Sequence, residues 1–260
     1  MIMETAVLST TRTGVNSILT RTGRHLVRNI QSIMLDALSV NTRYDPARVV
    51  CAGDWFLPTL LVPEDSLSVC NSQSYMESDV DIFLGTQSLF AGRPIDYDLI
   101  GIIINVVQSY GGRLIQNIQT QEGIRLLRQS RTTNVNVTSS AYEGTNQGAL
   151  CYLRFDVPIS SADLRRRTFS LNIIVTSLIG SSSGIADATA LLSTFDLDIL
   201  RCCSIKGTRE LNQLTYVMPS CLEALENKLV NEVHATTEER KLKHSERLRP
   251  LGFDFSWELE

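Results

Sequence analysis

Residues 78–85, with the sequence SDVDIFLG, constrain the fold most because acidic and apolar residues alternate along them. Successive side chains of a β-strand point to opposite faces. Asp79 and Asp81 therefore share one face of the predicted strand, and Val80 and Ile82 share the other. The pattern predicts two neighbouring carboxylates that serve either as metal ligands or as the solvated face of an edge strand.

The rest of the chain predicts a mixture of strands and helices. Apolar runs and alternating residues predict strands over 48–52, 133–139, 150–157, 169–177 and 194–204. Apolar residues at steps of three and four predict helices over 14–38, 95–110 and 219–249. The mixed order indicates an α+β or α/β fold, in which a mixed β-sheet has helices on its faces. The strand over 169–177 is expected near the centre of the sheet.

Three segments are expected along the chain. They are an N-terminal helical segment (1–44), an α/β core (45–218) and a C-terminal helical segment (219–260). Residues 5–34 carry four arginines, many Ser and Thr and no acid, which is also the composition of a mitochondrial transit peptide. Because Glu4 precedes this stretch and the helical pattern continues beyond it, a docked helix is favoured over a removed peptide. Either helical segment offers a surface to a protein partner.

Composition narrows the function classes. The 260 residues carry a net charge of −4, so nothing global favours non-specific binding of nucleic acid. Six cysteines without a C-x-x-C pair indicate reduced thiols, and the three histidines lack the spacing of a zinc site. No apolar run approaches the roughly 20 residues that span a bilayer, so no membrane partner is expected.

The acidic strand suggests metal-dependent phosphate chemistry. Magnesium prefers oxygen ligands and is commonly held by one or two carboxylates together with substrate phosphates. With a second ion it stabilises both the attacking and the leaving oxygen of a phosphoryl displacement. Gly53 follows the strand over 48–52, and a turn there would offer backbone N–H groups to the phosphates.

These motifs, in this order, resemble the nucleotidyltransferase fold of the polymerase-β superfamily. The matching stretches are VVCAGD at 49–54 and DVDI at 79–82. The chain is more similar to the nucleotidyltransferase-like proteins of large DNA viruses and some fungi, whose short motifs match at 78–83, 171–175, 195–202 and 247–253. The resemblance spans about residues 48–253 and is carried by short motifs rather than by continuous similarity.

The resemblance implies a nucleotidyltransferase that moves a nucleoside monophosphate from an NTP to a hydroxyl group. Asp79 and Asp81 would hold Mg²⁺ or Mn²⁺, and Gly53 with Asp54 would form the nucleotide-binding turn. Asp198, or less favourably Asp196, would deprotonate the acceptor. The implied location is the cytoplasm, which would be the host cytoplasm for a viral protein.

Two departures from the motif support a different function. Asp54 stands where the superfamily has a second Gly or Ser, and Asn172 is the best-placed residue where a third catalytic carboxylate is expected. An amide binds a metal poorly and cannot accept a proton as a base. The alternative is therefore a catalytically degenerate copy of the fold with a structural or protein-interaction role, in keeping with a viral source. A nucleic-acid partner stays open, although the net charge does not support it.

Overall fold

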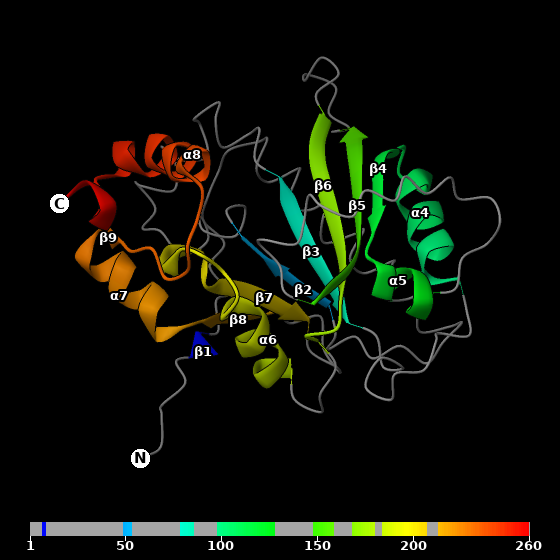
Figure 1. Cartoon of the computed structure of the whole chain (residues 1–260), viewed down its shortest axis with the longest axis horizontal. Helices are drawn as coiled ribbons and strands as arrows, with labels where there is room; N and C mark the ends of the chain where they lie inside the picture. Colours follow the sequence, from blue (N-terminus) through cyan, green and yellow to red (C-terminus); the bar gives the residue numbers. More distant parts are fainter. Residues whose placement is uncertain are drawn as a thin grey trace.

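The computed structural model of the chain (Figure 1) describes residues 7–8, 49–53, 79–85, 98–127, 148–158, 168–179, 184–206 and 213–259. Its centre is an eight-stranded sheet with the order β1-β8-β7-β2-β3-β6-β5-β4. The strands are β1 (Val7–Leu8), β2 (Val49–Ala52), β3 (Val80–Gly85), β4 (Arg113–Gln119), β5 (Ala149–Pro158), β6 (Thr168–Thr176), β7 (Cys202–Lys206) and β8 (Gln213–Val217). All neighbouring pairs are antiparallel except β3 and β6, which run parallel.

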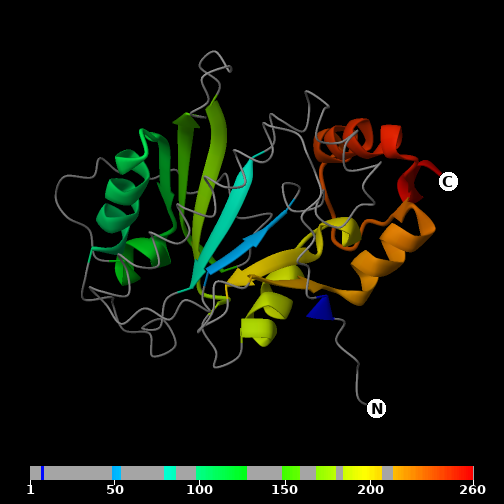
Figure 2. The same cartoon turned by 180° about the vertical axis from the view of Figure 1, so that it is seen from behind.

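Helices and short strands complete the fold. Within the described residues the α-helices are α4 (Leu99–Ser109), α5 (Gln121–Leu126), α6 (Gly184–Leu192), α7 (Pro219–Asn227) and α8 (Glu238–Leu248). The same part of the chain contains the 3₁₀ turns η4 (Asp198–Leu200), η5 (Arg249–Leu251) and η6 (Ser256–Glu258), and β9 (Leu229–Val230) pairs in parallel with β10 (Asp254–Phe255). Figures 1 and 2 show α4 and α5 beside β4, at the opposite end of the molecule from α7 and α8.

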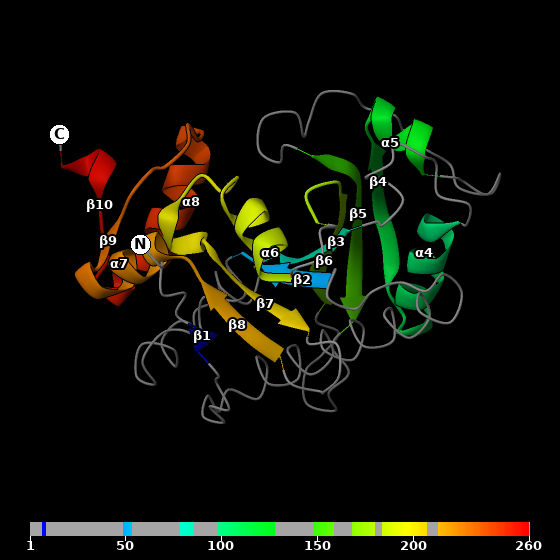
Figure 3. The same cartoon turned by 90° about the horizontal axis from the view of Figure 1, so that it is seen from below.

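Among the described residues, the two largest hydrophobic cores lie on the two faces of the sheet, and a smaller cluster joins Cys202, Val217 and Cys221. In β2, Val49 and Cys51 belong to the core that includes α4, whereas Val50 and Ala52 belong to the core that includes α6. The second core also takes in Val230 and apolar residues after it from the C-terminal elements. The C-terminal segment therefore shares a core with the sheet. Figure 3 shows α7 and α8 on the side of β7 and β8, away from β4.

Several sequence-based expectations are confirmed. The fold is mixed α+β, and the predicted strands over 48–52, 78–85, 150–157 and 169–177 correspond to β2, β3, β5 and β6. The last of these is interior, since it pairs with β3 on one side and β5 on the other. The helix expected over 95–110 is observed as α4, which begins after Asp98 because the Asp98 carboxylate accepts a hydrogen bond from the Gly101 amide at 2.8 Å.

The predicted strand over 194–204 is wrong in its first half. Residues before Cys202 form turns and η4, and only the part from Cys202 onward is a strand, β7. The motif FDLDIL alternates in sequence, but Asp198 accepts a hydrogen bond from the Asn231 amide at 3.0 Å, and Leu197 forms an isolated bridge with Glu232. Contacts with the C-terminal segment thus replace the regular pairing that a strand needs.

The predicted continuous helix over 219–249 is also wrong. It is interrupted after α7 because Lys228 adopts a left-handed conformation with φ of 53°, which ends the helix. The following residues form β9 and pair with β10, so Leu229 lies on a strand and not on a helix face. Helix α8 then begins after Thr237, whose hydroxyl accepts a hydrogen bond from the Arg240 amide at 3.3 Å.

Other expectations concern parts of the chain that the structure does not describe. The helix over 14–38 and the strand over 133–139 lie outside the described residues. Among the residues that are described, no helix combines the length and the hydropathy of a membrane span. The five described cysteines are buried, as expected for reduced thiols.

Candidate functional site

A cavity of about 140 Å³ lies between the sheet and helix α8, on the face that carries the second core. Carboxylates, basic residues of α8 and other polar or apolar side chains line it. The lining residues are Gly53, Asp79, Asp81, Phe83, Tyr152, Asn172, Ile174, Phe195, Asp196, Leu200, Arg240, Lys243 and His244. The cavity therefore brings together the residue after β2, the start of β3 and the residue before it, parts of β5, β6 and α8, and η4 with the turn that precedes it.

The turn at Gly53 lies directly over one of the predicted metal ligands. Gly53 follows β2 and has a φ of 91°, a conformation that side-chain-bearing residues rarely adopt. A Cβ atom at this position would lie 3.1 Å from Oδ2 of Asp81. Both the backbone conformation and the close approach to Asp81 favour glycine here.

Asp79 and Asp81 line the same cavity, as the alternation in the sequence predicts. Asp81 pairs with Ala52 of β2 across the antiparallel ladder. The adjacent thiol of Cys51 is buried, and this burial, together with the negative charge of Asp81, raises the pKa of Cys51 to about 12. Burial therefore favours the thiol form of Cys51, and its side chain belongs to the core on the other face of the sheet.

Asn172 connects Asp81 to a tyrosine. In the parallel pair of β3 and β6, Asn172 lies opposite Asp81, and its Nδ2 donates a hydrogen bond to Oδ1 of Asp81 at 2.8 Å. Its Oδ1 accepts a hydrogen bond from the Tyr152 hydroxyl at 2.7 Å. Because an ionised carboxylate only accepts hydrogen bonds, the amide must turn its NH₂ group toward Asp81.

Arg154 stands beside the other carboxylate. Its Nε donates a hydrogen bond to Oγ of Ser170 at 3.0 Å, and its Nη2 lies 3.9 Å from Oδ1 of Asp79. Both charged side chains are partly exposed, with 41% and 34% of their surface accessible, so this ion pair is weak. It nevertheless places a fixed positive charge next to the acidic pair.

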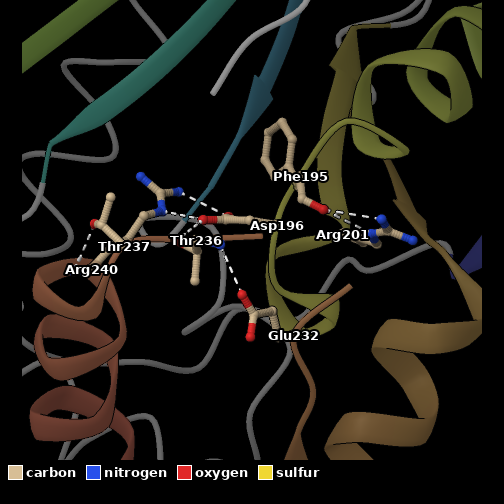
Figure 4. A network of polar contacts seen from close by, with 7 residues as sticks. All are labelled: Phe195, Asp196, Arg201, Glu232, Thr236, Thr237 and Arg240. Carbon is tan, nitrogen blue, oxygen red and sulfur yellow. Dashed lines mark hydrogen bonds and ion pairs between the residues drawn. The ribbon is translucent and has the colours of Figure 1, made fainter. Parts of the chain in front are cut away.

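The third carboxylate of the cavity, Asp196, is held by the segment before α8 and by α8 itself (Figure 4). Its Oδ2 accepts a hydrogen bond from the Thr236 hydroxyl at 2.7 Å and lies 2.5 Å from Nε of Arg240. Its Oδ1 accepts a second bond from Arg240 at 3.2 Å. Burial opposes ionisation of Asp196, but the Arg240 charge and these hydrogen bonds hold its pKa below the usual value.

Asp198 does not line this cavity, so the structure does not place it as the catalytic base that the motif resemblance implies. Its carboxylate accepts hydrogen bonds from the backbone N–H of Asn231 at 3.0 Å and from the Asn231 side chain at 2.8 Å. Burial raises the pKa of Asp198 above its usual value, against the effect of the Asn231 bonds. Because residues 198–200 form a 3₁₀ turn, Asp196 and Asp198 do not share a strand face. Through these hydrogen bonds Asp198 instead holds Asn231, the residue after β9, against the core.

The arrangement does not suit the magnesium or manganese ion that the motifs imply. These cations bind oxygen ligands. Here Asp81 faces an amide NH₂ group, and both Asp79 and Asp196 face guanidinium groups. Within the part of the chain that the structure describes, no three His, Cys, Asp or Glu side chains are grouped to hold a metal ion.

The expected nucleotide-binding turn is described only in part. Gly53 is at the cavity, but Asp54 lies outside the described residues. Residues at the site that the motifs did not predict include Tyr152, Arg154, Arg240 and His244. Tyr152 and Arg154 alternate with apolar residues in the predicted strand over 150–157, and this was a usable signal. Arg240 had none, because its contact with Asp196 depends on how α8 packs.

Comparison with known proteins adds no relationship. Neither the protein-family models nor the curated proteins contain a match to this sequence. The functional argument therefore depends on the site itself.

Replacing Asp196 with asparagine is expected to destabilise the fold by about 2 kcal/mol near neutral pH, the usual size for a hydrogen-bonded charge. A carboxyl whose folded pKa lies below its ordinary value of 3.8 contributes stability above that value. The contribution is lost as pH falls through the folded pKa. Urea unfolding of the wild-type protein and the Asp196→Asn variant should therefore give different free energies of unfolding near pH 7. This difference should shrink at pH values below the ordinary pKa of 3.8.

Asp156→Asn is the matched control for this measurement. Asp156 pairs at 3.1 Å with Arg113, whose side chain is 77% exposed, so the expected cost is below about 1 kcal/mol. An Asp196→Asn cost that stays the same at acidic pH would show that the Arg240 charge does not stabilise the carboxylate.

Proposed function

We propose that this chain is a nucleotidyltransferase-like protein that has lost nucleotidyl transfer and serves a structural or protein-interaction role. The resemblance supports the first half of the proposal. Two antiparallel strands, β2 and β3, bring Gly53 and the acidic pair to one cavity, and the parallel neighbour β6 supplies Asn172.

One observation carries the loss of activity. Asn172 stands opposite Asp81, where the resemblance calls for a third carboxylate on a central strand, and it donates a hydrogen bond to Asp81 at 2.8 Å. Its amide cannot take a proton from an acceptor hydroxyl as a general base. Asp196 does not substitute for it, because Arg240 and Thr236 already bind its carboxylate.

A second candidate, an active metal-dependent nucleotidyltransferase, is favoured by the Gly53 turn over Asp81. In that case Asp79 and Asp81 would bind Mg²⁺ or Mn²⁺, and the NTP phosphates would lie near Gly53 and the basic side chains of α8. The candidate bases that the described residues place at the cavity for this mechanism include His244 and Asp196, and Asp196 is already paired with Arg240.

The C-terminal elements are the proposed contact region for a protein partner. Leu242 of α8 is 60% exposed and Leu259 is 69% exposed, and both belong to the segment after residue 218. The cytoplasm remains the proposed location, because buried thiols suit a reducing compartment.

Incubation with radiolabelled NTPs and Mg²⁺ or Mn²⁺ is expected to transfer no label to protein, nucleic acid or small hydroxyl acceptors. NTP and metal together should also leave the melting temperature unchanged, because a ligand stabilises only a fold that it binds. The matched control is the Asp79→Asn/Asp81→Asn variant. Label transfer by the wild-type protein that this variant lacks would establish the transferase and overturn the proposal.

A further inference from the structure

We propose that Arg154 and Asn172 take the place of a metal ion at Asp79 and Asp81, so that the site is built to work without a divalent cation. This inference rests on the proposed function and deepens it. Where the resembling motifs imply a cation, these two side chains stabilise the acidic pair instead.

Strand register brings the two donors to the acids. Arg154 of β5 lies opposite Asn172 of β6, and Asn172 lies opposite Asp81 of β3. Directly paired residues of neighbouring strands project from the same face of a sheet. One row across three strands therefore contains a guanidinium, an amide and a carboxylate.

The amide of Asn172 is fixed at both ends. Tyr152 donates to its oxygen at 2.7 Å, and its nitrogen donates to Asp81 at 2.8 Å. Only 4% of the surface of Asn172 is accessible, so no water shell competes for these bonds. Oδ1 of Asp81 therefore accepts a hydrogen bond from a donor that cannot easily rotate away, which leaves fewer lone pairs of Asp81 for a cation.

The guanidinium of Arg154 is oriented in the same way. Ser170 accepts a hydrogen bond from its Nε, which leaves the Nη2 group directed at Asp79 across 3.9 Å. Two aspartates on one strand face repel each other, and a positive charge beside them reduces this repulsion. The same charge opposes an incoming divalent cation, and the partial exposure of Arg154 keeps this opposition modest.

Titration with Mn²⁺, followed by the electron paramagnetic resonance of the free ion, tests this proposal. The wild-type protein is expected to show no saturable binding up to millimolar Mn²⁺. The Asn172→Asp/Arg154→Met variant replaces the amide with a carboxylate and removes the charge, so positions 79, 81 and 172 of the cavity lining then all carry carboxylates. We expect it to bind Mn²⁺ at least about tenfold more tightly, because the number of charged oxygen ligands sets affinity at such sites.

Two controls keep the test decisive. Arg113→Met removes an exposed arginine of β4 that pairs with Asp156 away from the acidic pair, and it should leave Mn²⁺ binding unchanged. Circular dichroism shows whether the double variant folds. If this variant does not fold, the titration of the wild-type protein still tests the proposal. Saturable Mn²⁺ binding by the wild-type protein that the Asp81→Asn substitution abolishes would overturn the inference. A double variant that folds but binds Mn²⁺ no more tightly than the wild-type protein would overturn it as well.

This test separates the inference from the proposed function. Wild-type protein that binds Mn²⁺ but transfers no label contradicts the inference alone. Wild-type protein that transfers label without binding Mn²⁺ contradicts the proposed function alone.

Discussion

Replacing Gly85 with alanine is expected to destabilise the fold by about 3 kcal/mol, because an added methyl group in a packed interior forces the backbone to move. Gly85 ends β3, the strand that carries the acidic pair. A Cβ atom there would lie 2.1 Å from the backbone oxygen of Ile179 and 2.6 Å from its Cβ. These are rigid neighbours that cannot swing aside as a flexible side chain would.

Urea unfolding of wild-type protein and variant measures this effect, and Gly252→Ala is the matched control. Gly252 has a φ of 77° and no atom within 4 Å of the added Cβ. The control therefore suffers only the strain of a left-handed residue, about 1 kcal/mol. Equal losses of unfolding free energy in the two variants would show that a clash with Ile179 is not the reason that residue 85 must be glycine.

Replacing Asp198 with alanine is expected to cost about 3 kcal/mol of unfolding free energy. The change leaves the backbone N–H and the side-chain NH₂ of Asn231 without their acceptor, and each unsatisfied partly buried donor carries a penalty of about 1–3 kcal/mol. Because Asn231 follows β9, the loss should loosen the C-terminal segment first. Hydrogen exchange of the Asn231 amide would report this loosening directly.

Asp198→Asn is the matched control, since it keeps one oxygen for the Asn231 backbone N–H and should cost about half as much. This comparison also separates the structural role of Asp198 from the catalytic role that the motifs imply. A catalytic base would give variants that are as stable as wild type but inactive. An Asp198→Ala variant with unchanged stability would contradict the assignment as a structural carboxylate.

The cavity combines acids on the sheet with bases on α8. Asp79 and Asp81 come from the sheet, whereas Arg240, Lys243 and His244 lie at steps of three and four along one helix face. Arg240 of α8 bonds to Asp196 in the turn before η4, and within the sheet Asn172 bonds to Asp81. The first of these contacts connects the C-terminal helix to the residues beside the sheet.

Local patterns in the sequence were sufficient for much of this description. The alternation of acidic and apolar residues predicted β3 and the common face of Asp79 and Asp81, because the period of a strand is a property of the backbone. The glycine at the end of β2 and the strands β5 and β6 followed from the same kind of local signal. The sequence also drew attention to Asn172 on the predicted central strand, and the structure places this residue opposite Asp81.

Only the tertiary structure decided which of these residues meet. The bond between Asn172 and Asp81 joins residues 91 positions apart and depends on the register of β3 and β6. The alternation at Asp196 and Asp198 predicted a strand, but contacts with the C-terminal segment turned one carboxylate toward Arg240 and the other toward Asn231. A periodic pattern specifies the face on which a side chain lies, whereas the neighbour across that face is set by strand pairing and helix packing far along the chain.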